Sequence, residues 1–123
     1  PRVILFREEH TRRTMVEKVD FISAPGTSAE GVYRPGGPYA LITSLGLFAF
    51  DKTRARFRLT SIHPGHSLEE ILDNTGFEFD RDEVIPETAA PSAEWLGLLR
   101  GKIAGEVADP YPKFAHAVFG VSA

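Results

Sequence analysis

The pattern that most restricts the fold is an apolar run, a short turn and a strictly alternating run, all within residues 46–62. The apolar run ends at the turn residues 51–53, and basic and apolar side chains alternate after them. The alternating residues include Arg54, Arg56, Phe57, Arg58 and Leu59. A period of two places successive side chains on opposite faces of a strand. The sequence therefore predicts a β-hairpin with one buried face and one solvated face, on which the arginines serve solubility and edge protection.

Further strands are predicted before this hairpin. Residues 3–6 form an apolar run without alternation, which is typical of a parallel strand buried on both faces. Residues 39–43 are a second β-favouring run, and residues 19–22 resemble a strand more than a helix. Residues 23–38 between them are rich in glycine and proline, which predicts a long loop on the surface or at an interface.

A helix is predicted directly after the hairpin. Ser67 and Glu70 form a capping box, and apolar positions recur over residues 68–72. Gly76 is expected to end the helix in the left-handed conformation. Residues 77–79 alternate and predict a brief strand.

The last part of the chain is predicted to hold one more helix. Ser92 is a capping residue, and four apolar side chains follow on one helical face: Trp95, Leu98, Leu99 and Ile103. Residues 108–123 contain two prolines and scattered aromatic residues. They are expected to form a tail that packs on another surface or frays.

Composition excludes several classes of function. The 123 residues are 42% hydrophobic, as in a globular domain. They carry a net charge of −3 without a run of like charge, so we expect neither nucleic acid nor anionic lipid as a partner. The absence of cysteine excludes disulfides and cysteine zinc sites and fits the cytoplasm. The longest apolar run, residues 45–50, is too short to span a membrane. Because the chain begins at Pro1 without an initiator methionine, we expect a fragment of a longer protein.

The candidate binding residues follow the first predicted strand. Glu8, Glu9 and His10 come directly after it, and open α/β sheets bind ligands at the carboxyl ends of their strands. The alternative is a set of surface residues, or a local ion pair with Arg12 or Arg13. Both interpretations remain open at this stage.

The other histidines do not form a recognisable site. His63 and His66 flank Pro64 and Gly65, which indicates a turn, and their spacing is not that of a zinc-binding helix. His116 stands alone among small apolar residues. We therefore predict no metal site, and no serine shows the context of a hydrolase nucleophile.

Three segments resemble one family in order and in spacing. Residues 13–22 (RTMVEKVDFI) are similar to the "FVEKVDFI" segment of the β subunits of family I CoA-transferases, of the glutaconate CoA-transferase type. Residues 39–51 are similar to their "VVTDLAVFDF" pattern. Residues 62–77 are similar to their "LHPG…EEV…NTGF" signature. The resemblance covers about ninety residues.

The resemblance implies a partial three-layer α/β/α fold of the NagB/RpiA type, with a β-hairpin. Residues 1–123 would be the C-terminal part of a single β-subunit domain, with residues 108–123 as its tail. Such a protein pairs with an α subunit. Its glutamate attacks an acyl-CoA and forms acyl and then CoA thioester intermediates.

The resemblance also implies that the chemistry depends on residues outside this chain. The glutamate and a glycine-rich oxyanion loop are expected before Pro1, so the chain contains no catalytic residue and is expected to be inactive alone. Coenzyme A is expected as a substrate, with no other cofactor. Glu9 and His10 match an acidic-histidine pair of related transferases and are expected near the mouth of the active site as substrate-binding residues. The alternatives are a CoA-thioester hydrolase of the same fold and a non-catalytic assembly module.

Overall fold

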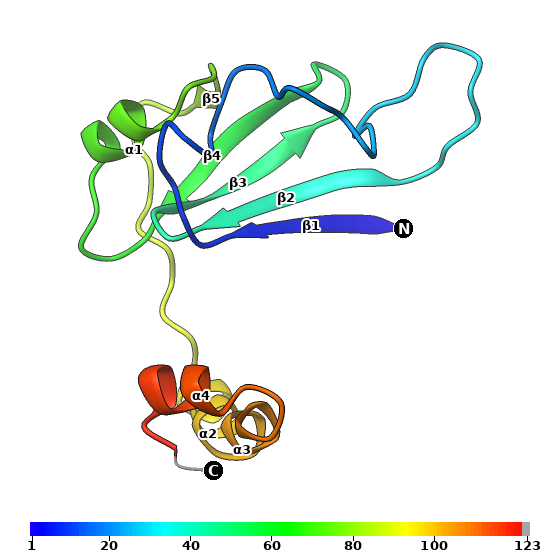
Figure 1. Cartoon of the computed structure of the whole chain (residues 1–123). Coiled ribbons are helices and arrows are strands. Elements are labelled where there is room, and N and C mark those ends of the chain that lie inside the picture. The colour runs from blue at the N-terminus through cyan, green and yellow to red at the C-terminus, as the bar shows by residue number, and fades with distance from the viewer. Residues whose placement is uncertain (122–123) are drawn as a thin grey trace. The chain divides into compact units, whose positions relative to one another are not determined.

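The computed structural model describes residues 1–121, which form two compact units divided after Thr88. The first unit is a five-stranded mixed sheet in sequential order with one helix (Figure 1). Its elements are β1 (Arg2–Arg7), β2 (Gly37–Thr43), β3 (Gly46–Asp51), β4 (Arg56–Ile62), α1 (Leu68–Asn74) and β5 (Asp80–Arg81). β1 pairs with β2 and β4 with β5 in parallel, whereas β2, β3 and β4 are antiparallel neighbours.

Most of the predicted strands are confirmed, but the strand predicted at residues 19–22 is wrong. This segment belongs to an irregular stretch between β1 and β2, and Phe21 is 82% exposed. A short apolar run forms a strand only when a neighbouring strand accepts its backbone hydrogen bonds, and this segment has no such neighbour in the described structure. The brief strand predicted at residues 77–79 is also wrong at those residues, and a two-residue strand, β5, follows them.

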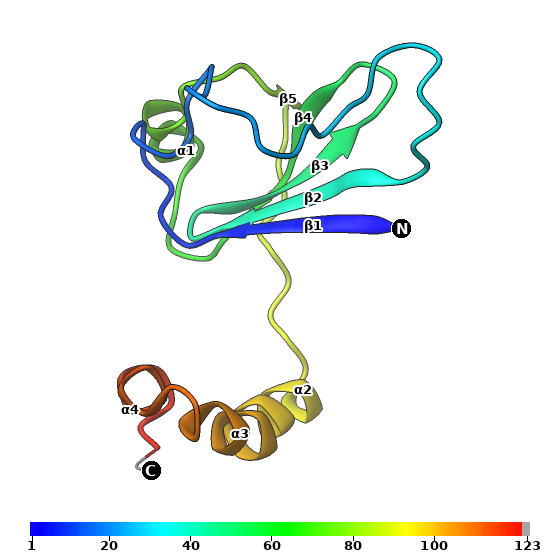
Figure 2. The ribbon, with the colours of Figure 1, turned by 45° about the vertical axis from the view of Figure 1, so that its right-hand side comes forward.

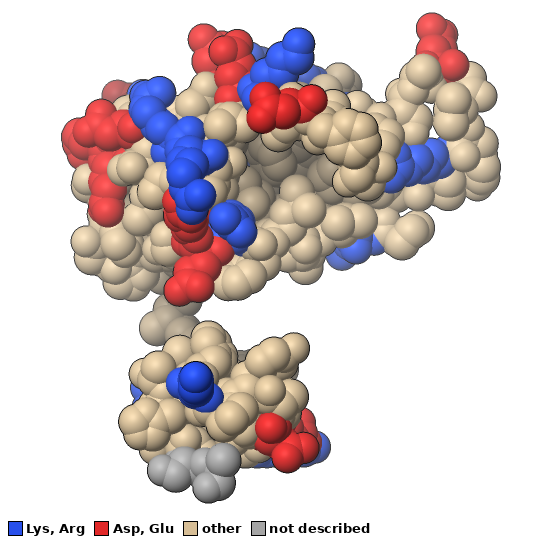
Figure 3. Space-filling view, viewed as in Figure 1, with Lys and Arg blue, Asp and Glu red and all other residues tan. Residues whose placement is uncertain are grey.

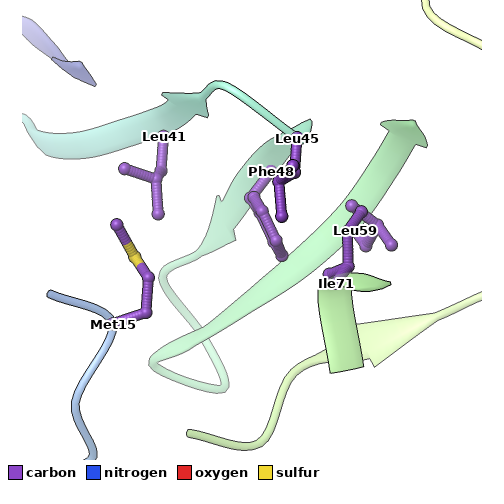
Figure 4. Packing of buried hydrophobic residues seen from close by; sticks show 6 residues of the cluster. All are labelled: Met15, Leu41, Leu45, Phe48, Leu59 and Ile71. Carbon is purple, nitrogen blue, oxygen red and sulfur yellow. The ribbon is translucent and has the colours of Figure 1, made fainter. Parts of the chain in front are cut away.

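The core lies on one face of the sheet, beneath α1 and the segment that contains Met15 (Figures 1 and 2). Leu41, Phe48 and Leu59 lie opposite one another on β2, β3 and β4, so they share this face. Ile71 of α1 packs against them (Figure 4). Phe48 and Ile71 have no exposed surface, which places the centre of the core between β3 and α1.

Strand β1 is exposed, although its sequence predicts burial on both faces. Each of its six residues is exposed, Ile4 by 58% and Phe6 by 74%. The prediction is wrong because, among residues 1–121, β1 is the edge strand and pairs only with β2. Ile4 and Phe6 belong to the sheet face opposite the core, since Phe6 aligns with Ile42 and not with Leu41. A parallel strand of this composition normally has neighbours on both sides.

Helix α1 begins as predicted but ends differently. The hydroxyl of Ser67 accepts a hydrogen bond from the backbone N–H of Glu70, which confirms the cap. At the other end, Thr75 is the C-cap in an extended conformation, and Gly76 does not have a positive φ. The N–H of Gly76 instead donates to the carbonyl oxygen of Met15 at 2.6 Å. Gly76 therefore allows the backbone at the end of α1 to lie close to the backbone of Met15, and it does not form a left-handed turn.

The arginines of the hairpin are paired with acidic residues. Arg54 lies 2.6 Å from Asp80, Arg56 lies 3.4 Å from the same carboxylate, and Arg58 pairs with Asp82. Basic and acidic side chains also lie side by side on the visible face of the molecule (Figure 3). This arrangement agrees with the predicted solvated face and leaves no separate basic patch on that face for phosphate groups.

The second unit is helical. It contains α2 (Ala93–Leu98), the π-helical turn η1 (Leu99–Ile103), α3 (Ala104–Ala108) and α4 (Pro112–Phe119). Ser92 caps α2 as predicted, by accepting from the N–H of Trp95. Much of the predicted tail 108–123 is helix α4, while its residues 122–123 lie outside the described residues. Among residues 1–121, no helix is both long and apolar enough to cross a membrane.

Candidate functional site

Three strand ends meet at one edge of the sheet. β1 and β2 are parallel, and β4 runs in the same direction because β3 lies antiparallel between β2 and β4. The N–H of Ser44 donates to the carbonyl of Glu8 at 3.2 Å, and the N–H of His63 donates to the carbonyl of Leu45 at 2.9 Å. Carboxyl ends of strands are the usual ligand-binding side of open α/β sheets. The strand-end edge consists of residues 8–10, 43–45 and 62–66.

His10 lies buried behind this edge, with 4% of its surface exposed. Its Nδ1 lies 2.8 Å from the hydroxyl oxygen of Thr43, and its Nε2 lies 2.7 Å from that of Thr75. Burial lowers the pKa of His10 below its ordinary value, and the nearby charge of Glu70 opposes this shift. Its ring is also near the ring of Phe48, at 6.0 Å between centroids. Both ring nitrogens are therefore occupied within the protein.

Glu9 is more accessible, with 33% of its side chain exposed, and it forms the local ion pair considered from the sequence. Arg13 donates to both of its carboxylate oxygens, at 3.1 and 2.6 Å, and the hydroxyl of Thr11 donates at 2.9 Å. These hydrogen bonds, first that of Arg13, lower the pKa of Glu9. Arg12 instead donates to backbone carbonyls at the end of α1. Glu9 is therefore an ionised, restrained carboxylate at the strand-end edge.

His63 also bonds to Thr43, as His10 does, and the sequence did not indicate this contact. Its Nε2 lies 2.9 Å from the carbonyl oxygen of Thr43, and its Nδ1 lies 2.8 Å from the hydroxyl of Thr88. That hydroxyl also lies 2.7 Å from the hydroxyl of Ser61. The proline and glycine after His63 indicated a turn, but no local pattern revealed its bonds to residues twenty and twenty-five positions away. His66 turns away and contacts Glu70 at 2.9 Å.

An open hollow of about 440 Å³ lies at the surface beside Thr75. It is lined by Arg12, Glu17, Thr75, Gly76, Phe77 and Glu78. His10 lies behind this lining through its bond to Thr75. Among residues 1–121, no group of three or more histidine, aspartate or glutamate side chains could hold a metal ion. His116 lies in α4, outside the first unit.

No protein-family model matches the chain, but curated proteins do. It is 36% identical over 104 residues to the B subunit of 3-oxoadipate CoA-transferase from Pseudomonas knackmussii, covering 80% of the chain and 39% of that relative. It is 31% identical over 102 residues to the B subunit of glutaconate CoA-transferase from Acidaminococcus fermentans, covering 77% of the chain and 38% of that relative. It is 32% identical over 106 residues to the cholesterol ring-cleaving hydrolase IpdB subunit of Rhodococcus jostii, covering 83% and 40%.

Solved structures give the same relationship. The structure of Rhodococcus jostii IpdAB matches with a TM-score of 0.73 at 30% identity, over 81% of the chain and 42% of that chain. Glutaconate CoA-transferase of Acidaminococcus fermentans matches with a TM-score of 0.71 at 28% identity, over 85% and 42%. The decarboxylase AibA/AibB matches with a TM-score of 0.61 at 29% identity, over 80% and 37%. The predicted α/β fold is thus confirmed for the part that the chain spans.

The resemblance first noted in three short motifs therefore extends to most of the chain and to its three-dimensional structure. The chain spans about two fifths of the length of the curated relatives that it matches. In sequence and in fold, the chain belongs to the β-subunit family of the family I CoA-transferases.

Proposed function

We propose that the chain is the C-terminal part of a β subunit that works with an α subunit to move CoA between carboxylic acids. The observation that carries this proposal is the match to the β subunits of two transferases over more than three quarters of the chain. Coenzyme A acts as a substrate, no further cofactor takes part, and the reaction takes place in the cytoplasm. The names IpdAB and AibA/AibB support assembly with an α subunit.

The exposure of β1 supports the proposal that this chain is part of a larger domain. A parallel edge strand with exposed Ile4 and Phe6 leaves both apolar surface and unpaired backbone groups accessible. Such an edge promotes association with other chains unless another element covers it. The relatives are about two and a half times as long as the matched region, so the rest of the β subunit supplies the cover.

The glutamate nucleophile lies outside this chain. Of the two glutamates at the strand-end edge, Glu8 is exposed, and Glu9 has a restrained carboxylate because Arg13 and Thr11 engage both of its oxygens. A nucleophilic carboxylate needs a free lone pair directed at the thioester carbonyl and an oxyanion site beside it. In the proposed reaction, the glutamate displaces the CoA thiolate, which then attacks the glutamyl carbonyl and releases the donor acid. The acceptor acid takes the CoA by the reverse of these two exchanges.

The test is reconstitution of the complete β subunit with its α subunit, followed by addition of an acyl-CoA and an acceptor acid. We expect a hydroxylamine-sensitive CoA thioester on the enzyme, and we expect no thioester on this chain alone. Light scattering measures assembly in the same samples. Assembly without a thioester, across a panel of acyl-CoAs and acids, would contradict the proposal and favour a non-catalytic module.

A hydrolase of the same fold is the second candidate, because the IpdB subunit is named a cholesterol ring-cleaving hydrolase and IpdAB matches the fold with a TM-score of 0.73. That name supports hydrolysis as a reaction class, and the CoA thioester is our proposal for the bond that this chain's complex would cleave. The two candidates differ in the fate of the CoA. A hydrolase of the CoA thioester releases free CoA when no acceptor acid is present, whereas a transferase needs the acceptor. Thiol titration in samples without acceptor separates them.

We further propose that Glu9 contacts substrate at the mouth of the active site. Replacement of Glu9 by glutamine in the complete complex is expected to raise the KM for substrate about three- to tenfold, because the change removes one charge and one acceptor. Steady-state kinetics measures this effect. The matched control is Arg13→Gln, which removes the ion pair but keeps the carboxylate. Equal effects of the two substitutions would show that only the ion pair matters and would contradict a substrate contact.

A further inference from the structure

Two imidazole rings meet at one residue, Thr43, which is 2% exposed. His10 bonds to its hydroxyl at 2.8 Å, and His63 bonds to its backbone carbonyl at 2.9 Å. The two histidines come from different strand ends, since His10 follows β1 and His63 follows β4. Thr43 is the last residue of β2, which lies next to β1 in the sheet. One residue thus joins all three strand ends.

The hydrogen bonds around His10 determine its protonation. The hydroxyl of Thr75 donates its proton to the carbonyl of Ile71 at 2.6 Å, so it can only accept from the ring. Nε2 of His10 therefore carries a proton. The hydroxyl oxygen of Thr43 accepts from the N–H groups of Leu45 and Gly46, both at 3.2 Å, and its own proton is then available to Nδ1. Neutral His10 with the proton on Nε2 satisfies every group.

The same reasoning applies to His63. The carbonyl of Thr43 has no proton to donate, so Nε2 of His63 must donate to it. Nδ1 lies 2.8 Å from the hydroxyl of Thr88, which lies 2.7 Å from the hydroxyl of Ser61, and this pair of hydroxyls can serve the ring as donor or as acceptor. Both histidines thus carry a proton on Nε2, and for His10 the connected bonds also leave Nδ1 without one.

We propose that His10 and His63 are positioning residues, which hold the strand-end edge in one arrangement through Thr43. The frame is the name used below for these two rings and Thr43 together with the hydrogen bonds that join them. The hydroxyl of Thr43 also closes the turn between β2 and β3, and the exposed Ser44 lies in that turn. The N–H of Ser44 donates to the carbonyl of Glu8, so the frame also sets the backbone that carries Glu9. The link from this frame to catalysis rests on the proposed function, whereas the frame itself does not.

The frame is intact only while His10 is neutral. A second ring proton on Nδ1 would face a hydroxyl oxygen that already accepts two N–H groups, and the hydroxyl proton would be left with the carbonyl of Gly46 at 3.4 Å. Around the ring, β2 and β3 present uncharged Thr43 and Phe48, and the C-cap of α1 is uncharged Thr75. Glu70 of α1 is the charge that acts on it, and burial outweighs its effect.

The sign of the pH dependence follows from this lowered pKa. Below the ordinary histidine pKa of about 6.5, the unfolded chain binds a proton that folded His10 excludes. Stability is therefore full above about pH 6.5 and falls as the pH is lowered toward the folded-state pKa. Because burial is the first cause of the lowered pKa, this dependence reports the burial of the His10 ring.

The experiment combines ring NMR and kinetics on the complete protein. In its unmodified form, we expect Nε2 of both rings to carry a proton, Nδ1 of His10 to carry none at pH 7, and His10 to titrate below pH 6.5. In the complex with the α subunit, Thr43→Val should lower kcat on the order of tenfold or more, and Thr43→Ser should restore it. Thr60→Val is the matched control, because the hydroxyl of Thr60 bonds to the carbonyl of Leu47 outside the frame.

Each readout can contradict the inference separately. A ring without a proton on Nε2, a proton on Nδ1 of His10 at pH 7, or ordinary titration of His10 would overturn the frame without any measurement of activity. If the NMR result holds and Thr43→Val loses no more activity than Thr60→Val, the positioning role is overturned. If the unmodified complex shows no transfer or hydrolysis, the proposed function fails while the ring tautomers still decide the frame.

Discussion

Replacing Phe48 with alanine is expected to lower the free energy of unfolding by about 3–5 kcal/mol, the usual cost of removing a fully buried aromatic side chain. Phe48 has no exposed surface and lies at the centre of the core (Figure 4). Its ring meets the edges of Phe57 and Phe79, with centroid distances of 6.4 and 5.4 Å. The substitution therefore removes both buried area and two specific ring contacts.

Urea denaturation followed by circular dichroism measures this loss. The matched control is Phe21→Ala, which removes the same side chain from a position that is 82% exposed and should change the free energy by no more than about 0.5 kcal/mol. Similar losses for the two substitutions would contradict the assignment of the core. Because His10 packs beside Phe48, the Phe48 variant should also shift the ring resonances of His10.

The elements whose signals come from residues close together in the chain could be predicted from the sequence. The apolar run, turn and alternating run within residues 46–62 predicted the β3–β4 hairpin, and Ser67 with Glu70 predicted the start of α1. These signals succeed because each depends on residues that are close in the sequence. The side chain of Asp51 shows the same principle, since it accepts the N–H groups of Thr53 and Arg54 to form the turn.

The predictions that failed depend on distant parts of the chain. The composition of β1 indicates burial, but burial requires a neighbouring strand that the described residues do not supply. Residues 19–22 have a strand-like pattern but no strand to pair with in the described structure. A sequence pattern gives the secondary structure that a segment can adopt, and pairing with another strand decides whether the strand forms.

The candidate site was predicted only in part. Residues 8–10 do follow β1 at the carboxyl ends of the strands, and the structure contains the ion pair of Glu9 with Arg13, which was one of the two interpretations left open. The burial of His10 was not visible, because its partners Thr43 and Thr75 lie 33 and 65 residues away. A polar residue that is buried and fully bonded by distant residues has no local signature.

Replacing Gly76 with alanine is expected to lower the free energy of unfolding by about 2–4 kcal/mol, through overpacking and a lost hydrogen bond. A Cβ atom at this position would lie 2.5 Å from the carbonyl oxygen of Met15, which is backbone and cannot rotate away. The N–H of Gly76 bonds to the same oxygen at 2.6 Å. Relief of the clash must therefore move the segment of Met15, which follows His10 closely in the chain, away from the end of α1.

The matched control is Gly97→Ala in α2, where an added Cβ meets no atom within 4 Å. Alanine there should be neutral or stabilise the helix by about 0.5–1 kcal/mol, because glycine is the poorer helix former. Denaturation of both variants measures the difference, and NMR of His10 reports whether its bond to Thr75 persists. If Gly76→Ala leaves stability and the His10 resonances unchanged, the close approach to Met15 does not exist in solution. The end of α1 would then depend on backbone conformation alone, as the sequence first suggested.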